Sequence, residues 1–145
     1  MYRNILIPTD GSELSKKAIE HGVALAKALG AKVTAVTVTM PFHIFALEPA
    51  AAIGSLESYA QRAGERAANV LAVVTEAAAA AGVTCDAVSV EHEHPYRAII
   101  DTATRRGCDL IVMASHGRRG VSAIVLGSET VKVLTHSAVP VLVYR

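Results

Sequence analysis

Hydrophobic and polar positions alternate along this chain in two kinds of segment. Short runs of mostly apolar, often β-branched residues predict strands at Ile5–Ile7, Lys32–Thr39, Val83–Glu91, Asp109–Ala114 and Ala138–Tyr144. Longer segments, in which apolar residues recur with a helical period, predict helices at Glu13–Leu29, Leu56–Ala81, Pro95–Arg106 and Ser128–Thr135. Strand and helix segments therefore alternate from one end of the chain to the other.

The helix predicted at Glu13–Leu29 has the clearest amphipathic pattern. Gly30 follows it, and glycine tolerates the left-handed conformation in which many helices end. Five residues at helical spacing predict its buried face: Leu14, Ala18, Gly22, Leu25 and Leu29.

This alternation predicts the α/β class, with one open, twisted, parallel five-stranded sheet and helices on both faces. The run Asp109–Ala114 is nearly all apolar, which indicates a central strand covered on both sides. The stretch Met40–Ser55 contains two prolines and a glycine, and we expect a long loop there that could act as a flexible lid. With no break in composition and no repeat, we expect residues 1–145 to form one domain.

Composition narrows the classes of function. Hydrophobic residues make up 52% of the 145 residues, which excludes a disordered chain. A net charge of +1, 4% aromatic residues and no tryptophan give no indication of nucleic-acid or membrane-surface binding. Cys85 and Cys108 do not form a CxxC pair. Because no signal-peptide core or apolar stretch of about 20 residues is present, we expect a cytoplasmic protein.

The loops after the first and fourth strands carry the candidate chemistry. In a strand order of 3-2-1-4-5, both loops would face one crevice at the point where the order reverses. Gly117 would let the backbone approach a ligand, and Gly127–Ser128 would open a helix whose free N–H groups favour an anion. The alternative is a loop with turn glycines and an ordinary serine cap. Asp10 is either an acceptor for a ribose or base, or a helix cap.

Other familiar motifs are absent. The chain has no GxxxxGK[ST], no GxGxxG after the first strand and no GxSxG. His92 and His94 lack the further ligands that zinc needs, so a surface or capping role is favoured. His116 lies in the glycine-rich loop, where a loop-structuring hydrogen bond is favoured over a phosphate contact.

Three segments together resemble the universal stress protein family over essentially the full chain. They are Ile5–Ser12, Asp109–Gly120 and Gly127–Val143. The resemblance implies the 3-2-1-4-5 order and a Rossmann-like fold similar to the adenine nucleotide alpha hydrolases. Nucleotide-binding members carry G-x2-G-x9-G-[S/T], which Gly117, Gly127 and Ser128 match, whereas Ala114 replaces the first glycine.

The resemblance also implies a binding site for ATP, or for AMP or ADP, with Mg²⁺. Arg118 or Arg119 could fold over a phosphate, and Glu129 would act through its N–H because its carboxylate repels the ligand. On the nucleoside side the implied residues are Pro8, Thr9, Asp10, Val38, Met113 and Ala114. On the phosphate side they are Gly117, Arg118, Gly127, Ser128 and Glu129.

Family resemblance and the apolar chain end together imply a homodimer. The segment Val139–Tyr144 is apolar and would be an edge strand, which invites pairing with a second copy. The function implied is a dimeric, nucleotide-dependent sensor or switch in a stress response, with a downstream partner that the sequence does not name. Two alternatives stay open: a slow ATP hydrolase, or a nucleotide-free structural dimer if Ala114 disables the motif.

Overall fold

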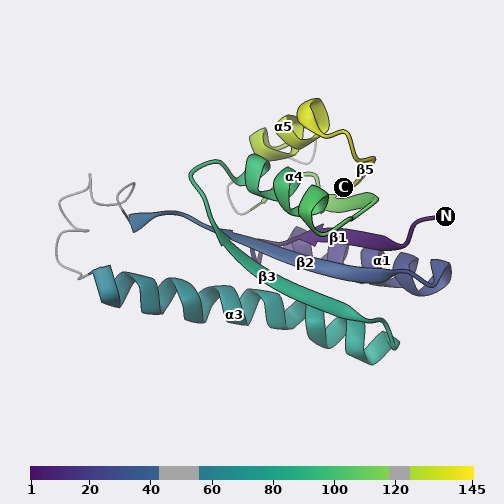
Figure 1. The fold of residues 1–145 in the computed structure, drawn as a ribbon, viewed down its shortest axis with the longest axis horizontal. Helices are drawn as coiled ribbons and strands as arrows, with labels where there is room; N and C mark the ends of the chain where they lie inside the picture. The colour runs from purple at the N-terminus through teal and green to yellow at the C-terminus, as the bar shows by residue number, and fades with distance from the viewer. Residues whose placement is uncertain (43–55, 118–124) are drawn as a thin grey trace.

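A computed structural model describes residues 1–42, 56–117 and 125–145 (Figure 1). Its centre is a parallel five-stranded sheet in the order β3-β2-β1-β4-β5, as predicted. The strands are β1 (Asn4–Pro8), β2 (Lys32–Thr39), β3 (Cys85–Glu91), β4 (Leu110–Ala114) and β5 (Val141–Tyr144).

Helices cover both faces of the sheet, which is the predicted Rossmann-like arrangement (Figure 1). The helices are α1 (Glu13–Leu29), α3 (Leu56–Ala81), α4 (Pro95–Arg105) and α5 (Ser128–His136). Side chains of α1 and α3 form one core cluster with the sheet, and side chains of α4 and α5 form a second cluster on the other face.

Strand β1 shows how the pleat divides the core between the two faces. Ile5 and Ile7 belong to the cluster under α1 and α3, whereas Leu6 belongs to the cluster under α4 and α5. All three side chains are fully buried. Every residue of β4 is buried as well, so the prediction of a covered central strand is confirmed.

Two strands, β3 and β5, begin at least two residues later than predicted, for local reasons. Val83 donates its N–H to Ala78 O at 2.8 Å and so completes the end of α3, which moves the start of β3 to Cys85. Ser137 exchanges hydrogen bonds with the backbone of Val139 at 2.7 and 3.0 Å. That local turn and the proline at 140, which has no N–H, delay β5 until Val141.

The buried face predicted for α1 was wrong in part. Leu29 is 37% exposed, and Leu14 is only half-buried. The helix instead buries a stripe of mostly small side chains, which lets its axis approach the sheet and pushes the leucines to the margins: Ser15, Ala18, Ile19, Gly22, Val23 and Ala26.

The expectations about the Met40–Ser55 loop and about membrane spans can be compared only with the described residues. The loop predicted at Met40–Ser55 lies mostly outside the described residues, which resume at 56. Among the helices of the described ranges, none is long and apolar enough to cross a membrane.

Candidate functional site

The loops after β1 and β4 begin side by side, because the two strands are paired at Ile5–Leu110 and Leu6–Ile111. The strand order reverses between them, and this is the position where open α/β sheets bind ligands. The loops touch: a Cβ atom on Gly117 would overlap Oδ2 of Asp10. The structure therefore brings together the two segments in which the sequence predicted chemistry.

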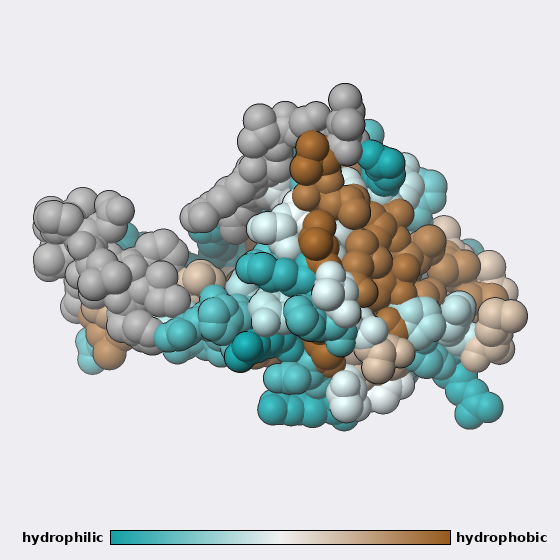
Figure 2. All heavy atoms as spheres, turned by 90° about the horizontal axis from the view of Figure 1, so that it is seen from above, coloured by the Kyte–Doolittle hydropathy of each residue, from teal (hydrophilic) through white to brown (hydrophobic). Residues whose placement is uncertain are grey.

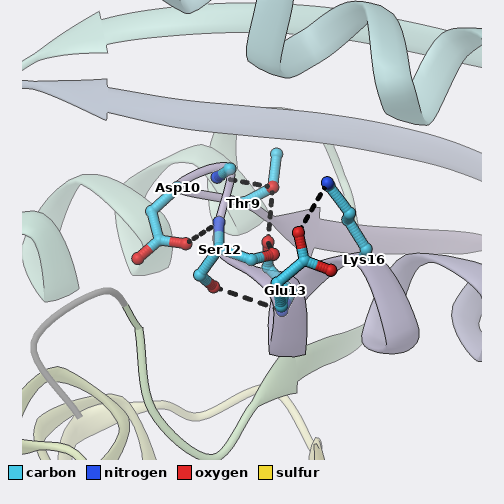
Figure 3. Close-up of polar contacts among 7 residues, drawn as sticks. Thr9, Asp10, Ser12, Glu13 and Lys16 are labelled. Carbon is cyan, nitrogen blue, oxygen red and sulfur yellow. Dashed lines mark hydrogen bonds and ion pairs between the residues drawn. The ribbon is translucent and has the colours of Figure 1, made fainter.

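The β1–α1 loop is held by hydrogen bonds within the loop and to the neighbouring elements β2 and α1; Figure 3 shows those around Thr9, Asp10 and Ser12. Buried Thr9 donates its N–H to Val36 O at 2.9 Å and its hydroxyl to Ser15 Oγ at 3.2 Å. Asp10 Oδ1 accepts from Ser12 N at 2.9 Å, and Ser12 Oγ caps α1 by accepting from Ser15 N at 3.2 Å. The reading of Asp10 as the helix cap is therefore wrong, since Ser12 holds that position and Asp10 forms the preceding turn.

A surface ion pair flanks this loop on the α1 side. Lys16 Nζ lies 2.8 Å from Glu13 Oε1, and this hydrogen bond lowers the pKa of the Glu13 carboxyl. Figure 3 shows the side chains of Asp10 and Lys16 pointing to opposite sides of the loop. Asp10 thus faces the β4 loop at Gly117, and Lys16 belongs to the α1–α3 face.

Ala114 fits its position without strain. It lies in β4 opposite Tyr144, is 8% exposed, and its carbonyl accepts from Thr130 Oγ1 at 3.0 Å. Among the described residues only glycines have positive φ, so the backbone at Ala114 is one that any residue adopts. The replacement of the motif's first glycine therefore carries no conformational cost.

Gly127 brings the start of α5 against the end of β4. Its N–H donates to Ser115 O at 2.7 Å, and a Cβ atom here would lie 3.1 Å from His116 Cα. Gly127 is the N-cap of α5 and offers no side chain to the helix, while Ser128 is its first helical residue. The reading of Ser128 as an ordinary cap is therefore wrong, and no side chain at the cap satisfies the first-turn N–H groups.

The carboxylate of Glu129 has its partners outside the first turn of its own helix. Oε2 accepts from Tyr96 N at 2.8 Å at the beginning of α4, and Oε1 lies 3.3 Å from Lys132 Nζ. The cap residue of α4, His94, makes no side-chain hydrogen bond to the first turn, and Pro95 has no N–H to donate. Glu129 therefore supplies the side-chain acceptor for the N–H of Tyr96. This contact was missed because no local pattern links residues 33 positions apart.

The residues assigned to the nucleoside gather at one end of the sheet. Pro8 ends β1 opposite Val36. Val38, near the end of β2, is half-buried against the core cluster that contains Met113, which is 6% exposed. Val38 and Met113 thus contribute to the same face of the sheet, beneath α4 and α5.

The remaining candidates have local roles or lie outside the described ranges. Arg118 and Arg119 fall within residues 118–124, which the structure does not describe. His116 Nδ1 lies 3.2 Å from Ser115 Oγ, and His92 Nδ1 accepts from His94 N at 2.8 Å. Among the described residues no group of three or more His, Cys, Asp or Glu is arranged to hold a metal ion.

Comparison with families and relatives agrees with this geometry. Residues 1–145 match the model of the universal stress protein family. Universal stress protein MJ0531 of Methanocaldococcus jannaschii is 33% identical over 147 residues, covering 100% of this chain and 83% of the relative. A universal stress protein of Thermus aquaticus is 34% identical over 145 residues, covering 100% of both chains.

Solved structures share the fold. Protein MJ0577 of M. jannaschii superposes with a TM-score of 0.82 at 29% identity, over 99% of this chain and 95% of that one. A universal stress protein in complex with cAMP gives 0.74 at 22% identity, over 99% and 97%. One from Archaeoglobus fulgidus in complex with dAMP gives 0.73 at 17% identity, over 99% and 98%. For this chain, the last two establish the fold alone.

Proposed function

Because this chain belongs to the universal stress protein family, we propose that it binds an adenine nucleotide in the crevice between the β1–α1 loop and the start of α5. The observation that carries the proposal is the glycine cap of α5: among the described residues no side chain accepts from its first-turn N–H groups, which lie beside the loop that begins at the end of β4. The cAMP and dAMP complexes of two structural neighbours support adenosine monophosphates as the ligand class.

Each side of the crevice has its own role in this proposal. The main chain at Thr9 and the carboxylate of Asp10 form a polar wall for the ribose and base, with Pro8, Val38, Met113 and Ala114 as the apolar part. The phosphates lie against Gly117, Gly127, Ser128 and the main chain of Glu129. Arg118 is assigned to a phosphate on the family resemblance alone.

Glu129 is compatible with an anionic ligand because its charge is already engaged. Its two carboxylate oxygens contact Tyr96 N and Lys132 Nζ, neither of which belongs to the first turn of its own helix. The same contacts argue against Glu129 as a general base, so we propose a binding protein and not an ATP hydrolase. With ATP or ADP, Mg²⁺ would be held mainly by the ligand's phosphates, as is usual for this ion.

We propose that nucleotide occupancy is read out by a homodimer formed through β5. The two edge strands differ in character: β3 exposes Asp86, Ser89 and Glu91, whereas β5 exposes Leu142, which is 49% accessible. Charged edges resist pairing, and apolar edges invite it. Figure 2 looks onto the side of the molecule that carries α5 and shows a hydrophobic area there.

The dimer has a matched test. Leu142→Asp adds a charge to the apolar edge and is expected to give monomers in light scattering after size exclusion. Ser89→Asp makes the same kind of change on the β3 edge and is expected to leave the dimer intact. A Leu142→Asp protein that stays a soluble dimer would contradict this interface.

Nucleotide binding is tested first on the protein as purified. Without added nucleotide, the protein is denatured and the released small molecules are identified by mass spectrometry; we expect ATP, ADP or AMP at a stoichiometry approaching one per chain. If none is released, Mg-ATP and AMP are titrated back by calorimetry. Failure of both nucleotides to bind at millimolar concentration would overturn the proposed function.

A further inference from the structure

A groove of about 430 Å³ lies between α1 and α3, on the other side of the β1–α1 loop from the proposed nucleotide crevice. It touches the loop at Thr9 and Gly11, whereas Asp10 between them contacts Gly117. Figure 3 shows this division, because Lys16, which lines the groove, and Asp10 point to opposite sides. The groove is therefore a separate feature that shares only the loop with the crevice.

The groove carries an excess of positive charge. Lys16 of α1 and both Arg62 and Arg66 of α3 line it, with Glu65 as the one acidic side chain among the lining residues. Arg62 and Arg66 are four residues apart, so they share one side of the helix, where like charges destabilise each other. An anion bound between the two guanidinium groups would offset this repulsion, because it attracts both of them.

The existing partners of these cations leave room for a ligand. Arg62 donates to Ser58 Oγ at 3.1 Å, which is a neutral acceptor. Lys16 pairs with Glu13, whose side chain is 89% exposed, and such surface pairs contribute little to stability. Within the described ranges, no hydrogen bond or ion pair occupies the guanidinium of Arg66.

The same groove also has an apolar part. Val73 is 37% exposed although it lies in the middle of α3, and Val70 and Ile19 line the groove beside it. A volume of this size suits a small molecule, since ligand pockets commonly span about 300–1,000 Å³. A cationic rim beside an apolar floor matches a ligand that carries an anionic group on an apolar body.

We propose that this groove binds a small organic phosphate. The phosphate lies between Arg66, Arg62 and Lys16, where charge-assisted hydrogen bonds form, and the organic part covers Val70 and Val73. The proposal is independent of the nucleotide crevice, because it uses different side chains and a different face of the sheet.

The test locates binding directly on the full chain. Isotope-labelled protein is titrated with phenyl phosphate, and the amide resonances are followed by NMR. We expect saturable shifts at Gly11, Asn69, Val70 and Val73 with a Kd on the order of 1 mM, and at least roughly fivefold weaker binding of inorganic phosphate, which lacks the apolar part.

Three protein variants complete the experiment: two charge reversals, and one substitution that obstructs the proposed nucleotide crevice. Arg66→Glu is expected to weaken binding at least about tenfold, whereas Arg105→Glu, the same change on α4, leaves it unchanged. Gly117→Val, which obstructs the nucleotide crevice, leaves the groove shifts in place.

Three outcomes would overturn the proposal. Shifts confined to residues 127–130 would mean that the probe binds only at the start of α5. Equal weakening by Arg66→Glu and Arg105→Glu would mean that net charge alone attracts the probe. Absence of saturation at the groove would mean that it takes no such ligand, whatever the nucleotide crevice does.

Discussion

Helices α1 and α5 both begin next to the same end of the sheet, yet their first turns are completed in opposite ways. At α1, Ser12 caps the helix, Asp10 accepts from Ser12 N in the preceding loop, and Thr9 donates its hydroxyl to Ser15 of the helix. At α5, the cap residue is Gly127, which has no side chain to offer. A helix start that is completed by its own residues contributes to stability, whereas one left open keeps its N–H groups for a ligand.

Helix α4 provides a third case, in which another helix supplies the missing acceptor. Pro95 removes one N–H, and Glu129 of α5 accepts from Tyr96 N. Of the three helix starts, only that of α5 combines a glycine cap with a glycine loop and lies beside the strand reversal. This combination distinguishes the proposed phosphate position from the other two.

The largest expected effect comes from the contact between the two loops. Gly117→Val introduces a β-branched side chain where even a Cβ overlaps Oδ2 of Asp10, so it displaces that carboxylate and narrows the crevice. We expect nucleotide affinity to fall by at least roughly tenfold, in line with overpacking costs of about 1–3 kcal/mol. Calorimetry with Mg-ATP measures this, and Gly64→Val, made in open space on α3, is the control. Wild-type affinity in Gly117→Val would contradict the assignment of the crevice.

A serine cap on α5 would make it resemble α1. In Gly127→Ser, the new hydroxyl can accept from a first-turn N–H and compete with the ligand's phosphates. Gly127→Ala adds the same Cβ, 3.1 Å from His116 Cα, without the hydroxyl, so it isolates the effect of crowding. We expect Gly127→Ser to bind nucleotide several-fold more weakly than Gly127→Ala. Equal affinities in the two variants would show that the open cap is not what binds the phosphates.

Removal of the α1 cap is expected to change stability and not binding. Ser12→Ala deletes the oxygen that accepts from Ser15 N, which costs about 1 kcal/mol of unfolding free energy at an N-cap. Chemical denaturation measures that loss, and calorimetry measures the affinity, which we expect to stay within a factor of two or three. A large loss of affinity with little loss of stability would reverse the roles given to the two helix starts.

The smallest effect is expected from the substitution that restores the first glycine of the family motif. Ala114→Gly restores the first glycine of the motif, but the backbone there already has an ordinary conformation within β4. Nucleotide affinity should therefore stay the same or rise slightly in calorimetry. A marked loss would mean that the turn after β4 depends on the Ala114 side chain, which would contradict the unstrained backbone described at this position.

The sequence predicted the architecture well because its signals are local. Buried runs such as Ile5–Ile7, glycine after α1, and the alternation of strand and helix each depend on a few neighbouring residues. The α1 face was predicted less well: Ala18 and Gly22 are buried as predicted, but the sheet beneath the helix also buries Ile19, Val23 and Ala26 in place of the leucines. Leucines dominated the pattern, and the structure left Leu29 at the margin.

The candidate site was predictable in its parts but not in its contacts. The motif glycines and Asp10 could be read from sequence, whereas the contact of Gly117 with Asp10 depends on the strand order. Which residue caps each helix was also undecided, because Asp10, Ser12, Gly127 and Ser128 are all acceptable caps. The hydrogen bond from Tyr96 N to Glu129 joins two helices, and no sequence pattern in either helix predicts it.

The central claim is that the open start of α5, and not the capped start of α1, receives the phosphates. The most direct measurement is a titration of isotope-labelled protein with Mg-ATP and, separately, with adenosine, followed by amide NMR. Our account predicts that ATP, compared with adenosine, adds large shifts at Gly127, Ser128 and Glu129 and only small ones at Glu13. Identical shifts for the two ligands at α5, or phosphate-dependent shifts centred on α1, would contradict it.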